Sequence, residues 1–176
     1  MIIVNKQISE LDIDRNAYKP FIKNEWFRRN YMWFAYGLMI LIFEAAFFLG
    51  RFGVGSLLTK ILLYVAVYIV HESLHILTVC KKGDIYLSHS GLYLWLTPNF
   101  ELSKKRYLLF MTLPLLLLTG VTGTLSFFVS GEASLYLKLI AWLNAIAAGS
   151  DIINAVLIVI KPQDAFFYRG YYRRMI

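Results

Sequence analysis

The sequence has little cysteine, histidine and charge, and these shortages narrow the classes of protein to which it can belong. Its single cysteine, Cys80, excludes an intramolecular disulfide framework and a zinc site built from cysteines. Only 16% of the 176 residues are charged, whereas 59% are hydrophobic and the mean hydropathy is +0.58. A soluble domain of this length carries more charge, so the composition predicts an integral membrane protein.

The net charge of +7 is compatible with a nucleic-acid partner, but the distribution of the basic residues argues against one. Lysines and arginines cluster beside apolar runs, which is typical of membrane topology and of contact with anionic lipid headgroups. We therefore expect the lipid bilayer, and no nucleic acid, as the partner of these basic residues.

Four apolar runs are long enough to cross a bilayer, which takes roughly 20 mostly apolar residues in a helix. The predicted fold is an all-α integral membrane protein with about four transmembrane helices and a short cytoplasmic β-hairpin in the central loop. Glu44 interrupts the first run and Asp151 the fourth. The expected spans are 31–50, 55–80, 107–130 and 135–160.

The basic residues also predict the orientation of these spans. Fifteen of the 18 lysines and arginines lie in the N-terminal segment, the central loop and the C-terminal tail. Because basic loops stay on the inner side of the membrane, we expect both termini and the central loop in the cytoplasm. The chain then divides into a cytoplasmic or interfacial segment, 1–30, a membrane-embedded domain, 31–160, and a basic cytoplasmic tail, 161–176.

The pentapeptide His71-Glu72-Ser73-Leu74-His75 lies inside the second apolar run and holds two of the three histidines. In a helix, residues four apart lie on one face, one turn from each other. Two imidazoles at this spacing can bind one zinc ion, and Glu72 can serve as the general base for a water. Ionisable groups are costly inside a membrane span, so a functional site is favoured over chance occurrence in a core helix.

Catalytic zinc usually has three protein ligands, so a third is expected on another helix at a similar depth. Asp151 meets this condition, because it lies ten residues before Lys161 just as His71 lies ten residues before Lys81. At 1.5 Å per helical residue, each site lies about 15 Å from the same membrane surface. A hydrogen bond in helix packing is the alternative role for Asp151.

Other polar residues leave alternatives open. Glu44 is a rival third ligand, although it lies closer to the outer end of its span, and His89 in the central loop is a weaker rival. Asn154 follows Asp151 by three residues and shares its helix face, so it is a candidate for orienting a ligand or binding substrate backbone. Interhelical hydrogen bonding is the favoured alternative for Asn154 and for Asn144.

The motif in a membrane helix, followed by a late aspartate, resembles the intramembrane zinc metalloproteases of the site-2 protease type. The chain as a whole more closely resembles DUF3267, a small bacterial group of zincin-type peptidases, over about residues 55–160. The resemblance rests on the motif, on the proline-containing segment 96–103 and on Leu-Pro-Leu-Leu-Leu at 113–117. The chain has Gly149-Ser150-Asp151 where site-2 proteases have Asn-Pro-x-x-x-x-Asp-Gly.

This resemblance implies peptide-bond hydrolysis with Zn²⁺ held by His71, His75 and Asp151, in a bacterial cytoplasmic membrane. We therefore expect a membrane-embedded zinc endopeptidase acting on membrane proteins or peptides. The alternative is a non-enzymatic membrane adaptor or immunity protein that retains a structural metal. A metal carrier is disfavoured, because no chain of ligands crosses the membrane.

Two further features bear on access to the site. Pro114 is expected to kink the third span and to help open a cleft. In the central loop, 85–87 and 92–96 are predicted strands. An interfacial hairpin is favoured for them over an edge strand that binds substrate as an added strand.

Overall fold

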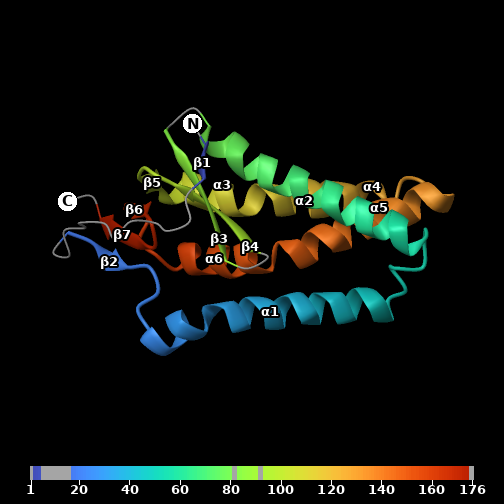
Figure 1. The fold of residues 1–176 in the computed structure, drawn as a ribbon, viewed down its shortest axis with the longest axis horizontal. Coiled ribbons are helices and arrows are strands. Elements are labelled where there is room, and N and C mark those ends of the chain that lie inside the picture. The colour runs from blue at the N-terminus through green and yellow to red at the C-terminus, as the bar shows by residue number, and fades with distance from the viewer. Residues whose placement is uncertain (1, 5–16, 81–82, 91–92, 175–176) are drawn as a thin grey trace.

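The computed structural model describes residues 2–4, 17–80, 83–90 and 93–174. Long helices run side by side, a small sheet lies at one end of them, and a hairpin crosses them obliquely (Figure 1). The fold is therefore mostly helical, as the sequence predicts.

Three helical segments are long and apolar enough to cross a membrane: α1, Glu25–Phe48; α2, Leu57–Val79; and the run Lys104–Leu125. Large apolar side chains cover their outer faces, and Trp33 and Phe48 on α1 are 73% and 84% exposed. Side chains of this size stay exposed on a helix when lipid rather than water surrounds it. The expected spans 31–50 and 55–80 thus correspond to α1 and α2.

The third span is helical throughout but changes its type of helix midway. It begins as α3, Lys104–Pro114, continues as a π-helix, Leu115–Val121, and ends as α4, Thr122–Leu125. The change begins directly after the buried Pro114, which cannot donate a backbone hydrogen bond. The structure therefore shows a change to the wider π-helix after Pro114, while the predicted kink and its role in opening a cleft stay predictions.

The fourth span is broken, so the prediction of one continuous helix over 135–160 is wrong. Helix α5, Gly131–Ala147, and helix α6, Gly149–Val159, meet at an angle of 62°. The junction packs closely against α1, because a Cβ atom at Gly149 would lie 2.6 Å from Cγ of Met39. A side chain larger than glycine at this position would require Met39 to move, and the structure has up to four possible spans if the bent pair is one of them.

The described residues also form two small sheets, so the expected all-α fold with one hairpin is incomplete. The predicted central hairpin is confirmed, and β1 joins it by parallel pairing with β3. The second sheet, in the order β2-β7-β6-β5, has no counterpart in the predicted fold. The strands are β1, Ile2–Val4; β2, Lys19–Pro20; β3, Ile85–Ser90; β4, Tyr93–Pro98; β5, Leu102–Ser103; β6, Ala165–Tyr168; and β7, Tyr171–Arg174.

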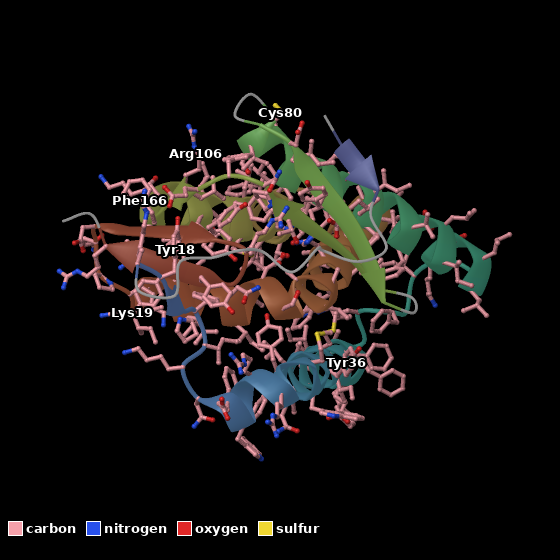
Figure 2. All side chains as sticks on the ribbon, turned by 60° about the vertical axis from the view of Figure 1, so that its left-hand side comes forward. Tyr18, Lys19, Tyr36, Cys80, Arg106 and Phe166 are labelled. Atoms are coloured by element: carbon pink, nitrogen blue, oxygen red, sulfur yellow. The ribbon has the colours of Figure 1, made fainter. Side chains whose placement is uncertain are left out.

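The second sheet packs against one end of the helices and shares a hydrophobic core with them. Phe21, Phe167 and Tyr172 pack with residues from the adjoining ends of the helices, such as Val79 and Ile158. Figure 2 shows Tyr18, Arg106 and Phe166 at this end of the molecule. The described parts of the N-terminal segment before α1 and of the C-terminal tail therefore lie at one end of the helices, as the predicted topology requires, while the side of the membrane stays a prediction.

Candidate metal centre

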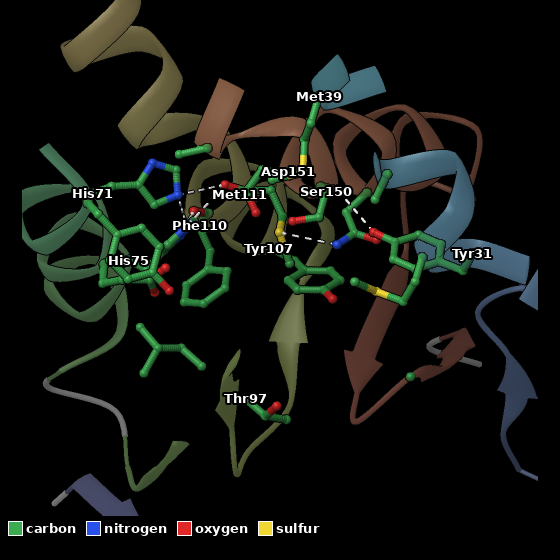
Figure 3. Close-up of a pocket in the computed structure, with 18 of the residues that line it drawn as sticks. Tyr31, Met39, His71, His75, Thr97, Tyr107, Phe110, Met111, Ser150 and Asp151 are labelled. Carbon is green, nitrogen blue, oxygen red and sulfur yellow. Dashed lines mark hydrogen bonds and ion pairs between the residues drawn. The ribbon is translucent and has the colours of Figure 1, made fainter. Parts of the chain in front are cut away.

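Helix α2 brings His71 and His75 together in the interior, where they are 3% and 4% exposed. They are one turn apart on one face, and their Nε2 atoms are separated by 3.1 Å. Figure 3 shows both rings pointing from α2 toward Asp151 on the neighbouring helix. The helical spacing of the pentapeptide thus has the geometric effect that the sequence predicts.

Asp151 completes a cluster of three possible ligand atoms. Its Oδ2 atom lies 3.0 Å from Nε2 of His71 and 3.2 Å from Nε2 of His75. Asp151 is in the first turn of α6, directly after the break between α5 and α6. The broken span therefore places its carboxylate beside the α2 histidines.

The second nitrogen of each ring fixes which way the ring faces. Nδ1 of His75 lies 2.6 Å from the backbone oxygen of Phe110, and Nδ1 of His71 lies 2.8 Å from Oδ1 of Asn144. Both partners are acceptors, so each Nδ1 carries a hydrogen, and each ring in its neutral form presents a lone pair at Nε2. The cluster thus directs two nitrogen lone pairs and a carboxylate oxygen at one another.

This set of donors fits a zinc ion. Lone pairs and a carboxylate at such short separations repel one another unless a cation or a proton lies among them. Tetrahedral zinc, with bonds of about 2.0–2.1 Å, holds its ligand atoms roughly 3.3 Å apart. The observed separations of 3.0, 3.1 and 3.2 Å are close to that value. Imidazole ligands whose second ring nitrogen donates to a carbonyl or amide oxygen are also typical of metal sites.

The cluster forms part of the wall of a cavity of about 610 Å³. The cavity lies between α1, α2, α3 and α6, and Leu96 and Thr97 of β4 also line it. Glu72 lines the same cavity, and the hydroxyl of Tyr68, one turn earlier on α2, hydrogen-bonds to its carboxylate. A carboxylate is thus available beside the three ligand atoms in a space that can hold a peptide segment.

The structure separates the other candidates from this cluster. Glu44 lies on the exposed face of α1, outside the only ligand group found among the described residues. His89 belongs to strand β3, and its side chain lies outside the described part of the structure. Asn154 lines the cavity but donates to Sδ of Met111 at 3.8 Å and hydrogen-bonds with Tyr31.

Several residues at the site do not follow from the sequence argument. Asn144 makes the expected interhelical hydrogen bonds, but one of them goes to His71. Asn144 is on α5 and Asp151 is on α6, so their spacing in the sequence does not indicate that contact. Tyr31 of α1, which donates to the backbone oxygen of Ser150 at 3.1 Å, had no signal in the sequence either. The signal for Phe110 is Pro114, four residues later, which has no N–H to donate to the Phe110 oxygen.

A comparison with known families matches this site and its surroundings. The family model of DUF3267, described as "Putative zincin peptidase", matches residues 64–166, which is more than half of the chain. The match includes α2 from Tyr64 onward, both histidines and Asp151. No curated protein and no solved structure matches the chain.

Proposed function

The chain belongs to the DUF3267 family of zincin-type peptidases, and from this premise we propose that it is a membrane-embedded zinc endopeptidase. Its substrates in this proposal are membrane-associated proteins or peptides. Family membership supports a metallopeptidase, and the apolar helices support a membrane protein. We add to this the location of the site within the membrane, the roles of the three ligands and the class of substrate.

One observation carries the proposal. The Nε2 atoms of His71 and His75 and the Oδ2 atom of Asp151 lie within 3.0–3.2 Å of one another on the wall of a cavity that Glu72 also lines. A structural metal alone needs neither the cavity nor a further carboxylate beside it. The combination is typical of a hydrolytic site, where one ligand position stays open.

His71, His75 and Asp151 would hold the zinc ion. When bound, zinc supplies Lewis acidity, which lowers the pKa of a water and polarises the scissile carbonyl. Glu72 accepts a proton from the attacking water as the new carbon–oxygen bond forms. It then gives that proton to the nitrogen of the leaving amine as the carbon–nitrogen bond breaks. The Tyr68 hydroxyl holds the Glu72 carboxylate in place for both transfers.

Strand β4 supports an extended peptide as the substrate. Within the described residues the sheet order is β1-β3-β4, so β4 is an edge strand. The backbone N–H of Asn99 donates to the oxygen of Asp84 at 2.9 Å, so these two residues form a hydrogen-bonded pair. Hydrogen-bonded and non-hydrogen-bonded pairs alternate along an antiparallel ladder, so Leu96, three residues earlier, is in a non-hydrogen-bonded pair with Leu87. The backbone N–H and C=O of Leu96 therefore point away from β3. Because Leu96 lines the cavity, a substrate can pair with it as an added strand. An interfacial anchor remains the alternative role for the hairpin.

The test compares two changes of glutamate to glutamine in apolar helices. Glu72→Gln removes the proposed base, whereas Glu44→Gln changes an exposed carboxylate on α1 and serves as the matched control. The full chain is purified in detergent, its zinc content is measured, and cleavage of a library of internally quenched peptides is followed. We expect about one zinc per chain in all three proteins, and a rate lower by roughly 10²–10⁴-fold in Glu72→Gln alone.

The outcomes separate the enzyme from the adaptor or immunity protein. Equal cleavage by the parent and by Glu72→Gln would refute the role of Glu72. Stable zinc without any cleavage in the parent would favour the non-enzymatic protein with a structural metal. A parent that binds no zinc would reject the metal site itself.

A further inference from the structure

Pro114 gives one histidine of the cluster its hydrogen-bond partner. In an α-helix the backbone N–H of each residue donates to the oxygen four residues earlier, and proline has no N–H to donate. Pro114 therefore leaves the oxygen of Phe110 without its helical donor. That oxygen accepts instead from Nδ1 of His75 at 2.6 Å. The side chain of Pro114 is fully buried, so water does not compete for this position.

The same turn of helix fixes the other histidine through Asn144. The amide nitrogen of Asn144 donates to the oxygen of Pro114 at 3.1 Å and to Oγ1 of Thr119 in the π-helix at 2.9 Å. Thr119 in turn donates to the oxygen of Ala141 at 3.0 Å, so its hydroxyl accepts from Asn144. With both amide hydrogens used, only Oδ1 of Asn144 is left to face Nδ1 of His71, at 2.8 Å.

We propose that Pro114 and Asn144 are positioning residues that set the tautomer and direction of the two zinc-binding rings. Pro114 acts through the Phe110 oxygen on His75, and Asn144 acts on His71. Together they place both ring hydrogens on Nδ1 and both lone pairs on Nε2, toward Asp151. The inference rests on the proposed zinc site, and it assigns Pro114 a role beyond the change of helix type in the third span.

A π-helix alone does not account for this arrangement. The change to a π-helix after Pro114 requires no acceptor beside His75. Asn144 is completely buried, and a buried amide whose polar atoms are all paired specifies one geometry of its surroundings. The partner of His75 is the oxygen of Phe110, one turn before Pro114. The partner of His71 is Asn144, which the oxygen of Pro114 holds in place.

The test changes each positioning residue in the full chain and measures two quantities. The first is zinc affinity, obtained by competition with a chelator. The second is the ¹⁵N ring spectrum of the zinc-free protein at about pH 8.5, well above the ordinary histidine pKa of about 6.5. With three histidines in the chain, the ring signals can be assigned by substitution.

Pro114→Ala restores an N–H that competes for the Phe110 oxygen, and alanine is the best helix former, so the helix is retained. We expect the His75 ring to lose its uniform Nδ1–H state and zinc affinity to fall about 10–100-fold, as for other partners of ligands. Leu116→Ala, on the exposed face of the π-helix, is the matched control and leaves both readouts unchanged.

Asn144→Leu removes the acceptor for His71, and Asn144→Asp keeps one. We expect the leucine variant to lose the Nδ1–H signature of His71 together with zinc affinity, and the aspartate variant to keep the signature. Parent-like affinity and ring spectra in both Pro114→Ala and Asn144→Leu would overturn the proposal. A parent that binds no zinc would reject the proposed function, while its zinc-free ring spectra still test the two residues.

Discussion

At the scale of single residues, Asp151 differs from the two histidines because it brings negative charge to the cluster. Its Oδ2 atom contacts both Nε2 atoms, and the residue is only 8% exposed. A buried carboxylate without a cation or a hydrogen-bond donor is strongly destabilising. The negative charge of Asp151 is therefore the strongest reason to expect a metal ion in the cluster.

Asp151→Asn keeps the shape of the side chain and removes its charge. We expect zinc affinity to fall roughly 100-fold or more, because losing only an outer partner of a ligand already costs about 10–100-fold. Equilibrium dialysis of the purified protein measures the loss. Asn154→Ala is the control, since Asn154 lines the same cavity but donates to Met111. Unchanged zinc affinity in Asp151→Asn would mean that a residue other than Asp151 is the third ligand.

Glu101 links the loop before α3 to the C-terminal strand. Arg173 donates to both of its carboxylate oxygens, at 2.6 and 2.7 Å, and the hydroxyl of Tyr18 donates to Oε1. The hydrogen bonds from Arg173 outweigh the effect of burial and hold the pKa of Glu101 below its ordinary value of 4.5. The ionised carboxylate therefore favours the folded arrangement.

The sign of this shift predicts a dependence on pH. A lowered carboxyl pKa stabilises the fold fully above the ordinary value of 4.5, and the contribution is lost as pH falls through the lower folded pKa. We expect Glu101→Gln to increase hydrogen exchange of the β7 amides at neutral pH, with the difference from the parent disappearing in acid. Asp164→Asn, which removes the longer 3.1 Å pair with Arg174, is the control and changes β7 less. A difference that persists unchanged in acid would contradict this role of Glu101.

At the scale of secondary-structure elements, the junction of α5 and α6 places Asp151 beside α2. Helix α1 presses on this junction through Met39 and Ala35, whose Cγ and backbone oxygen lie 2.6 and 3.4 Å from an ideal Cβ on Gly149. Small residues at such a crossing let two helices approach closely. The position of the third ligand thus depends on a contact with a helix that carries none of the ligands.

Gly149→Ala should therefore disturb the site from a distance. We expect it to lower the unfolding free energy by about 1–3 kcal/mol, as overpacking does, and to weaken zinc binding by displacing α6. Met39→Ala in the same chain makes room for the new methyl group and should restore most of both quantities. Thermal unfolding in detergent and zinc titration provide the measurements. Failure of Met39→Ala to restore either quantity would mean that the contact does not position α6.

The elements differ in how far the sequence predicts them. Spans are predictable because a bilayer imposes one length and one polarity on every crossing helix. The histidine pair is predictable because helical spacing alone places both rings on one face. The break at Gly149 is not, because it depends on how Met39 packs from another helix. The pairing of β2 with β7 and of β1 with β3 likewise joins segments that are distant in the chain, and no local pattern specifies it.

At the scale of the whole molecule, the helices have two unlike ends. The sheet of β2, β5, β6 and β7 lies at one end, and the connections after α1 and before α5 lie at the other (Figure 1). The N-terminal segment, the central loop and the C-terminal tail carry 15 of the 18 lysines and arginines. The retention of basic loops on the inner side therefore predicts that the end with this sheet faces the cytoplasm.

Cysteine labelling tests this orientation. Cys80, the single cysteine, is exposed and is first replaced by alanine. Glu132→Cys then places a thiol at the start of α5, and Gln163→Cys places one between α6 and β6, both at exposed positions. We expect a membrane-impermeant maleimide to label Glu132→Cys in intact cells and to label Gln163→Cys only after lysis. The reverse pattern would mean that the protein has the opposite orientation in the membrane. The end beside β4 would then face the outside, and substrates would have to come from that side.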